Sequence, residues 1–321
     1  MKRGILRDPL FFLEESLKIE IEVPENFRWD RLYRYWGRDP ASASEKAEQG
    51  RLRLGIRLPE GPVVVEVDHG PGRLICEVSD PDWGLGSGLR RGDDRGTSAF
   101  PSALLALRRM FGLEIDPQPF ERMIAAGPHA RLIAGREGQT VPQVPNVWDG
   151  LVWVVAGQQI SLAVAFALRR RLTQAVGARL AEDLWAPPSP EQVAALSPED
   201  LYALAFSRAK AKYILGAARA IAGGLDLESW RGRDPAEIEA GLLALHGLGP
   251  WSVNYLMMRA YGLPDRVPVG DAALVKSLAE FFGLPARPNP RETRELMAPF
   301  APWRSLATFH FWARLEKKPA D

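Results

Sequence analysis

The stretch from Leu245 to Leu278, LHGLGPWSVNYLMMRAYGLPDRVPVGDAALVKSL, constrains the fold more than any other part of the chain. Its pattern predicts the end of one helix, a tight glycine turn, a second helix, a return loop and a third helix that begins at a carboxylate. Gly247 and Gly249 flank Leu248, and this spacing lets the backbone turn through dihedral angles that glycine adopts without steric cost.

The glycine turn has two interpretations. It is either a plain connection between helices, with Leu248 as a core residue, or a binding site for a phosphate group. The second would use the outward amides of the turn and of the residues after Pro250, Trp251 and Ser252, because a helix N-terminus carries partial positive charge. A GxG pair alone favours the plain connection. The amphipathic helix before the turn and Asp271 after a Pro/Gly-rich loop favour the phosphate site.

Taken together, the hairpin and Asp271 resemble the helix-hairpin-helix signature of base-excision DNA glycosylases, and most closely that of the DNA-3-methyladenine glycosylase II (AlkA-type) family. The resemblance extends from about Pro117 onward and is weak before it. It implies that duplex DNA is the partner and that the hairpin contacts it. The hairpin positions implied as DNA-binding are Gly247, Leu248, Gly249 and Ser252.

Charge and cysteine content narrow the chemistry. The formal net charge of the 321 residues is only +1, so any positive field that attracts DNA must be local. Cys76 is the single cysteine, which excludes an internal disulfide and any zinc or iron–sulfur site made of several thiolates. We expect no cofactor. The N-terminus has only a short apolar run, so we expect a cytoplasmic protein, at the nucleoid if bacterial. We also expect a monomer.

The periodicity predicts an α+β protein. Residues 17–23, 51–58, 63–68 and 73–78 alternate as strands, and helices are expected over 29–36 and 99–111. These features predict a small antiparallel β-rich domain, residues 1–116, with helices on one face. The resemblance implies that it is similar to the TATA-binding protein. Residues 117–321 are expected to be all-helical, and the resemblance implies two helical subdomains with the DNA cleft between them.

Helix start signals are clear in the second part. Each has a capping side chain followed by proline, at Ser189, Ser197, Asp234 and Asn289.

Two further segments bear on DNA binding. Gln158 and Gln159 interrupt an apolar helix, either as solvated glutamines at its end or, by the resemblance, as residues that reach the minor groove, with Gln159 filling the space left by a flipped base. An apolar side chain would make a better wedge than Gln159. Arg208, Lys210 and Lys212 open another helix, and we expect a solvated face there rather than phosphate contacts.

Asp271 is the candidate catalytic residue. Breaking an N-glycosidic bond builds positive charge on the sugar, and a buried, ionised carboxylate stabilises that charge and orients water. One carboxylate suffices for an alkylated purine, which is already cationic. Local sequence alone makes Asp271 an N-cap. The resemblance assigns the family's catalytic aspartate to it, and Asp265 is the weaker candidate because it precedes Pro268-Val269-Gly270.

Trp251 sets the expected reaction type. By the resemblance, glycosylases that also cut the strand carry a lysine here, whose amine attacks the sugar. Tryptophan has no amine that could attack the sugar, so we expect a monofunctional enzyme, which releases the base and leaves the strand intact. Trp251 and Tyr255 share a helix face, as a core pair or as a platform for a cationic base. The resemblance adds Trp312 to the base pocket. Trp303 is expected to pack in the core, as is His310.

The resemblance further implies a structural monovalent cation at the backbone carbonyls of Leu243, Leu245 and Leu248. It makes 3-methyladenine and 7-methylguanine in double-stranded DNA the expected substrates. Two alternatives stay open. A non-catalytic helix-hairpin-helix DNA-binding protein would not need Asp271, and an oxidised-base glycosylase with strand-cutting activity would need a lysine at position 251.

Overall fold

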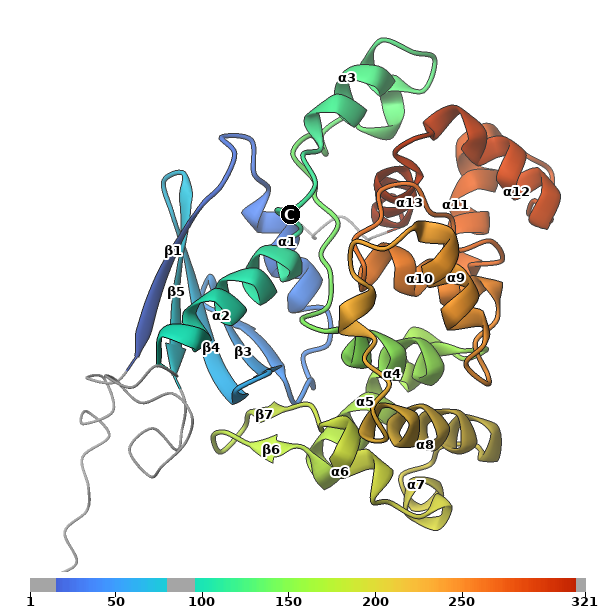
Figure 1. The fold of residues 1–321 in the computed structure, drawn as a ribbon. Coiled ribbons are helices and arrows are strands. Elements are labelled where there is room, and N and C mark those ends of the chain that lie inside the picture. Colours follow the sequence, from blue (N-terminus) through green and yellow to red (C-terminus); the bar gives the residue numbers. More distant parts are fainter. Residues whose placement is uncertain (1–15, 80–95, 316–321) are drawn as a thin grey trace, which may run out of the picture.

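The computed structural model describes residues 16–79 and 96–315, with the backbone alone for residues 96–100. The prediction about the extreme N-terminus therefore lies outside the described residues. Figure 1 shows an antiparallel sheet built from the first part of the chain, and beside it an assembly of helices built from the rest. The predicted α+β class is confirmed. No helix in the described ranges is long and apolar enough to cross a bilayer.

The sheet has five antiparallel strands in the order β1-β5-β4-β3-β2. The four predicted strands form close to their expected bounds, because their residues alternate between apolar and polar. The fifth, β2, was not predicted, since its sequence EKAE has no apolar alternation. The strands are β1 (Leu17–Glu22), β2 (Glu45–Glu48), β3 (Arg51–Leu58), β4 (Gly61–Gly70) and β5 (Arg73–Ser79).

One face of the sheet carries a core of its own. Leu52, Leu54 and Ile56 alternate along β3 and are buried together with Leu32 of α1 (Trp29–Trp36) and Leu107 of α2 (Gly96–Met110). Both predicted helices therefore pack on the same face of the sheet, as expected.

The remaining chain is mainly helical and forms a second core around Leu151, Ile214 and Leu256. It is not all-helical as expected, because a short two-stranded hairpin interrupts the helices over residues 178–186. The division into domains after residue 116 stays a prediction, and the two separate cores favour it. The helices are α3 (Gln118–Ala125), η2 (Ala130–Leu132), α4 (Val147–Gly157), α5 (Leu162–Val176), α6 (Pro190–Ala194), α7 (Pro198–Ala203), α8 (Arg208–Ala222), η3 (Glu228–Trp230), α9 (Pro235–Leu243), α10 (Pro250–Arg259), α11 (Ala272–Phe282), α12 (Pro290–Met297), η4 (Ala298–Phe300) and α13 (Arg304–Ala313).

Capping explains why several of these helices begin where they do. Ser189, Ser197 and Asn289 form reciprocal capping boxes, and Asp234 caps α9 through the Ala236 amide. Each of these four residues precedes a proline, which cannot continue a helix backward but fits its first turn. The predicted start signals are confirmed.

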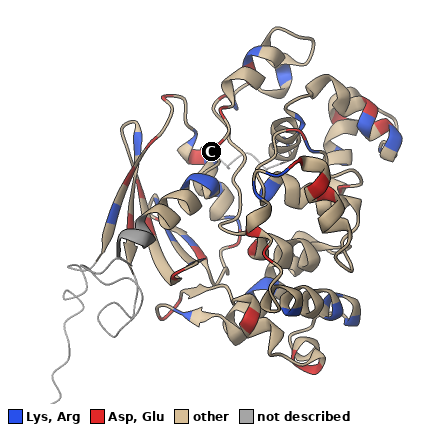
Figure 2. Ribbon diagram, in the orientation of Figure 1, with Lys and Arg blue, Asp and Glu red and all other residues tan. Residues whose placement is uncertain are grey.

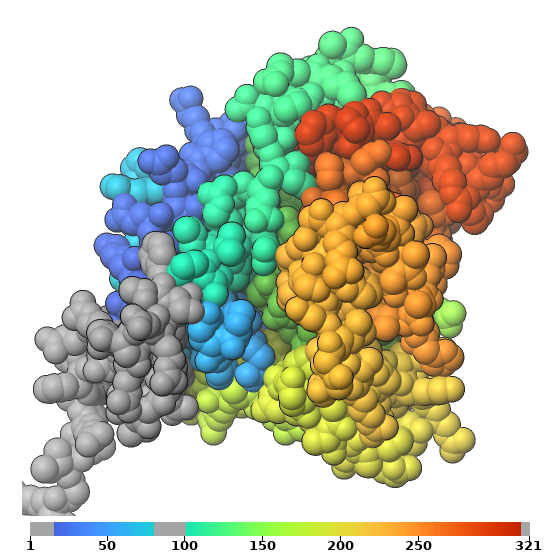
Figure 3. All heavy atoms as spheres, in the orientation of Figure 1, coloured from blue at the N-terminus to red at the C-terminus, as the bar shows by residue number. Residues whose placement is uncertain are grey.

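A small hairpin joins the two parts. It consists of β6 (Ala178–Arg179) and β7 (Trp185–Ala186), of which β7 lies against β3. The backbone carbonyl of Trp185 would stand 2.3 Å from a Cβ at position 55. Gly55 is therefore required by this close approach. The Trp185 amide donates to the Ala43 carbonyl at 2.8 Å, which fixes the hairpin to the segment before β2. In Figure 3 the sheet part and the orange-to-red helices form two masses with green segments between them.

Candidate active site

The glycine turn between α9 and α10 is compact because Gly247 has a φ of 94° and lies against the ring of Tyr213. A Cβ at this position would come within 2.2 Å of that ring. Leu248 is buried, so its side chain is indeed a core residue. Gly249 and Pro250 are exposed at the start of α10, where the first-turn amides have no partner within the helix. The start of α10 is therefore exposed at the turn, whereas the Leu248 side chain is not.

Asp271 caps α11 and also faces a cavity. Its Oδ1 accepts hydrogen bonds from the Leu274 amide and from the Trp312 indole, both at 2.8 Å. Its Oδ2 lies 3.4 Å from the Trp251 indole nitrogen. The two indoles come from α10 and α13, so three helices fix the carboxylate. The local interpretation as an N-cap is correct, but it accounts for only part of the site.

The cavity beside Asp271 has a volume of about 650 Å³ and an aromatic wall. The ring centroids of Trp251 and Tyr255 are 5.7 Å apart, and those of Tyr255 and Trp312 are 5.8 Å apart. All three rings line the cavity. The structure thus brings together the three predicted pocket residues and the predicted catalytic residue, although they span about 60 positions of sequence.

The floor of the cavity was not predicted. The Trp153 indole on α4 donates to the Tyr255 hydroxyl at 2.8 Å. Arg259, buried at the end of α10, donates to the hydroxyls of Tyr35 and Tyr255. Tyr35 comes from α1, so a helix packed on the sheet contributes to the pocket. The sequence places Arg259 one helical turn after Tyr255, which could have indicated a shared face, but nothing in it indicates the contact with Tyr35.

Comparison with known proteins identifies the family. The model of the "HhH-GPD superfamily base excision DNA repair protein" matches residues 152–302. The DNA-3-methyladenine glycosylase of Bacillus subtilis is 32% identical over 64% of this chain and 70% of that protein. DNA-3-methyladenine glycosylase 2 of Escherichia coli is 30% identical over 65% of this chain and 70% of its own length. The chain belongs to the AlkA-type DNA-3-methyladenine glycosylases.

Other relatives agree with this assignment. A probable bifunctional transcriptional activator/DNA repair enzyme AlkA of Mycobacterium tuberculosis is 28% identical to this chain. The match covers 94% of this chain and 57% of the other protein. Among solved structures, the 3-methyladenine DNA-glycosylase from Archaeoglobus fulgidus has a TM-score of 0.77 at 18% identity and covers 92% of this chain and 97% of its own. An 8-oxoguanine glycosylase/lyase from Clostridium acetobutylicum has a TM-score of 0.67 at 15% identity and covers 93% of this chain and 96% of its own. The fold alone therefore does not distinguish these damage classes.

Asp265, the competing carboxylate of this AlkA-type chain, has a different environment. It forms a two-pronged ion pair with Arg304, at 2.5 and 2.6 Å. The guanidinium of Arg304 holds the pKa of Asp265 below its usual value. This carboxylate fixes the start of α13 and is not among the residues that line the cavity.

Gln158 and Gln159 occupy different positions in the turn after α4. The Gln158 amide nitrogen donates to the Gly247 carbonyl at 2.8 Å and lies 3.1 Å from the Ser252 hydroxyl oxygen. Gln158 therefore ties the turn to the hairpin, and the Ser252 side chain, which is buried, belongs to the same contact. Gln159 is exposed and has a φ of 57°, which is uncommon for a residue other than glycine. Of the two, only Gln159 has its side chain free to enter a DNA duplex.

Lys210 corrects the prediction of a solvated basic face on α8. Its side chain is buried, and its ammonium donates to the carbonyls of Val155, Ala156 and Gln158 at 2.7 to 2.8 Å. Lys212, two residues along α8, is exposed as expected. In Figure 2 basic and acidic residues are interspersed over the ribbon, in agreement with the low net charge.

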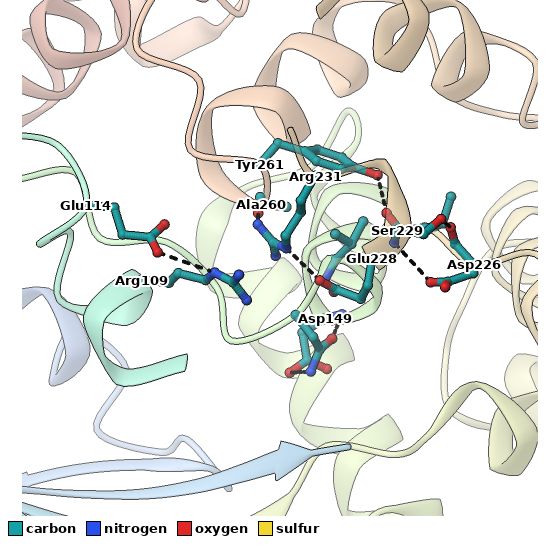
Figure 4. A network of polar contacts seen from close by, with 12 residues as sticks. Arg109, Glu114, Asp149, Asp226, Glu228, Ser229, Arg231, Ala260 and Tyr261 are labelled. Atoms are coloured by element: carbon teal, nitrogen blue, oxygen red, sulfur yellow. Dashed lines mark hydrogen bonds and ion pairs between the residues drawn. The ribbon is translucent and has the colours of Figure 1, made fainter. Parts of the chain in front are cut away.

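Helix α4 is also fixed at its N-terminus. The Glu228 carboxylate accepts a hydrogen bond from the Val147 amide, and Arg231 pairs with Glu228 at 2.6 Å while donating to the Ala260 carbonyl after α10. Figure 4 shows Glu228, Arg231 and Ala260 together, with Tyr261 close by. This network sets α4, which carries Trp153, against α10, which carries Trp251.

Two other predicted residues lie in the core. His310 is fully buried against Phe120, where burial lowers its pKa to about 3, and it is not among the residues that line the cavity. Trp303 packs against the helical core, as expected.

The cation site stays a prediction. One of its three carbonyls, that of Leu245, accepts a hydrogen bond from the Leu248 amide at 3.2 Å. Within the described ranges, no group of three His, Cys, Asp or Glu side chains is placed to hold a metal ion.

Proposed function

We propose that this chain is a monofunctional DNA glycosylase that hydrolyses the N-glycosidic bond of alkylated bases in double-stranded DNA, with Asp271 as the catalytic carboxylate. The observation that carries the proposal is the setting of Asp271. Its oxygens face indole and amide N–H groups at the wall of an aromatic cavity, and in the described part of the chain it forms no ion pair.

The glycosidic bond weakens as positive charge develops on the sugar ring. A carboxylate without a cationic partner can direct its full negative charge at the sugar ring. Because it is already in place, no groups need to be reoriented when the glycosidic bond breaks. The N–H donors of Leu274 and Trp312 fix its position. Asp271 would also orient the water that attacks the sugar carbon after the base departs.

The aromatic wall supports the choice of alkylated bases. Alkylated purines such as 3-methyladenine and 7-methylguanine are cationic, and a cation is attracted to the face of an indole or phenol ring. Trp251, Tyr255 and Trp312 present such faces beside Asp271. The base reaches this cavity only outside the double helix, at a cost of a few kcal/mol for unstacking. The exposed turn of the hairpin would hold the phosphates through backbone amides.

Trp251 distinguishes this proposal from the bifunctional alternative. An enzyme that cuts the strand through a Schiff base needs an amine beside the sugar. In the described part of the chain no lysine lines the cavity, and the ammonium of Lys210 is fixed on three carbonyls behind the Gln158 turn. We therefore propose that water is the nucleophile and that the product is an intact abasic strand.

The test uses methylated duplex DNA and the intact protein. Release of 3-methyladenine or 7-methylguanine is expected, without strand cleavage and without a covalent adduct on borohydride reduction. A borohydride-trapped adduct would contradict the monofunctional assignment. Normal DNA binding with no base release from a broad panel of lesions would favour the non-catalytic alternative.

A further inference from the structure

The turn between α4 and α5 has an unusual support. Lys210 reaches it from α8, which lies beside α4 (Figure 1). Its ammonium uses its three protons on three peptide carbonyls: those of Val155 and Ala156 in the last turn of α4, and that of Gln158 in the turn itself. The last carbonyls of a helix have no partner within it and carry partial negative charge, so a buried cation is well placed there.

The same turn contributes to the candidate active site. Gly157, Ile160 and Leu162 line the cavity that contains Asp271, and Gln159 stands exposed at the tip between them. The left-handed backbone of Gln159 is disfavoured for a residue with a side chain, and such a conformation persists only where the surroundings impose it. Two contacts impose it here, Lys210 on one side of the turn and the Gln158 bond to the hairpin on the other.

We propose that Lys210 is a positioning residue for base flipping, which holds the turn so that Gln159 enters the duplex as the target nucleotide leaves it. This inference rests on the proposed function, in which the damaged base is flipped into the cavity beside Asp271. Lys210 acts through the carbonyls of the turn and does not contact DNA. Its loss would slow the opening of a paired lesion and leave the chemistry of an already unpaired one intact.

The experiment compares Lys210→Met with the wild type on two substrates, 7-methylguanine paired with cytosine and 7-methylguanine in a single-nucleotide bulge. Methionine keeps the apolar stem and removes the ammonium. We expect the single-turnover rate on the paired lesion to fall about tenfold, which is the size of effect that the loss of a charged hydrogen-bond donor produces. The rate on the bulged lesion should change less than about twofold. Lys212→Met, exposed on the same helix, is the matched control and should leave both rates unchanged.

The role in the turn can be separated from general stability by a double-mutant cycle. In a Gln159→Ala background the effect of Lys210→Met on the paired lesion should largely disappear, because the side chain that Lys210 positions is gone. An equal fall on both substrates, or an undiminished effect in the Gln159→Ala background, would overturn the inference. Absence of base release by the wild type on either substrate would instead contradict the proposed function.

A measurement on the wild type alone covers the case in which Lys210→Met does not fold. Burial lowers the pKa of Lys210 to about 8, and no charged side chain contributes to that shift. The neutral amine has only two protons, so it can no longer donate to all three carbonyls of the turn. The ratio of the paired-lesion rate to the bulged-lesion rate should therefore fall as the pH rises from 7 to 9. A ratio that is independent of pH across this range would contradict the inference.

Discussion

Asp265 and Asp271 lie close together in the return loop after α10, yet their environments differ in the one respect that decides their chemistry. Asp265 is neutralised by a two-pronged ion pair with Arg304, whereas Asp271 is held by two indoles and one backbone amide. A carboxylate beside a guanidinium has little charge left for a substrate. One beside neutral donors is fixed in place and keeps its charge. Under the proposed function, the type of partner would separate the structural carboxylate, Asp265, from the catalytic one, Asp271.

The largest effect is expected from Asp271→Asn. The amide can still cap α11, so folding should be retained, but it brings no negative charge to the sugar. We expect base release from methylated duplex DNA to fall at least about 100-fold. Binding to the same DNA, measured by fluorescence anisotropy, should stay close to that of the wild type. Wild-type activity in this variant would remove Asp271 from the mechanism.

Trp312→Phe sharpens the comparison by keeping the ring and deleting the N–H that Asp271 accepts at 2.8 Å. We expect about a tenfold loss in the single-turnover rate, since one charge-assisted hydrogen bond no longer orients the carboxylate. Trp251→Phe is the matched variant, and it should lose less because its indole lies farther away, at 3.4 Å. The opposite order would mean that stacking, and not orientation of Asp271, is the main role of Trp312.

Asp265→Asn should affect stability and leave the chemistry intact. The ion pair with Arg304 is partly exposed, so its loss is expected to lower the free energy of unfolding by about 1 kcal/mol in urea denaturation. Base release should change less than about threefold. Because Arg304 lowers the pKa of Asp265, the ion pair contributes its stability above the ordinary carboxyl pKa and loses it as the pH falls through the folded value. A loss of activity as large as that of Asp271→Asn would abolish the distinction between the two residues.

The smallest effect concerns a third carboxylate, Asp149, in the first turn of α4. Burial, with a further contribution from Glu45, raises its pKa to about 6. The folded state therefore binds a proton more tightly than the unfolded state, and this group adds stability as the pH falls below 6. Asp149→Asn lacks this contribution. Between pH 7 and pH 5 its free energy of unfolding should therefore fall relative to that of the wild type by up to about 1 kcal/mol. An identical pH dependence in the variant would show that Asp149 has an ordinary pKa.

The sequence predicted what depends on local pattern. Alternation predicted four of the five strands of the main sheet, and side chains before prolines predicted four helix starts, because these signals act within a few residues. The strand β2 was missed because pairing with β3, and not its own composition, makes it a strand.

The candidate site was predicted where it resembles a known family and missed where it depends on distant contacts. The structure brings together the four residues expected in the site, Trp251, Tyr255, Trp312 and Asp271. Their roles in base binding and catalysis stay predictions. Lys210 was misjudged because its three carbonyl partners lie more than fifty residues earlier in the chain. A basic residue on a helix looks the same in sequence whether it faces water or the end of another helix.

The most direct test of the central claim measures affinity for the charge that Asp271 is proposed to stabilise. Duplex DNA with a cationic pyrrolidine in place of the damaged nucleotide mimics the charged sugar, and a tetrahydrofuran in the same position is its neutral counterpart. The wild type and Asp265→Asn should bind the cationic duplex more tightly, by about tenfold or more, whereas Asp271→Asn should bind the two equally. If Asp271→Asn retained the full preference for the cation, the charge of Asp271 would not be what drives the reaction.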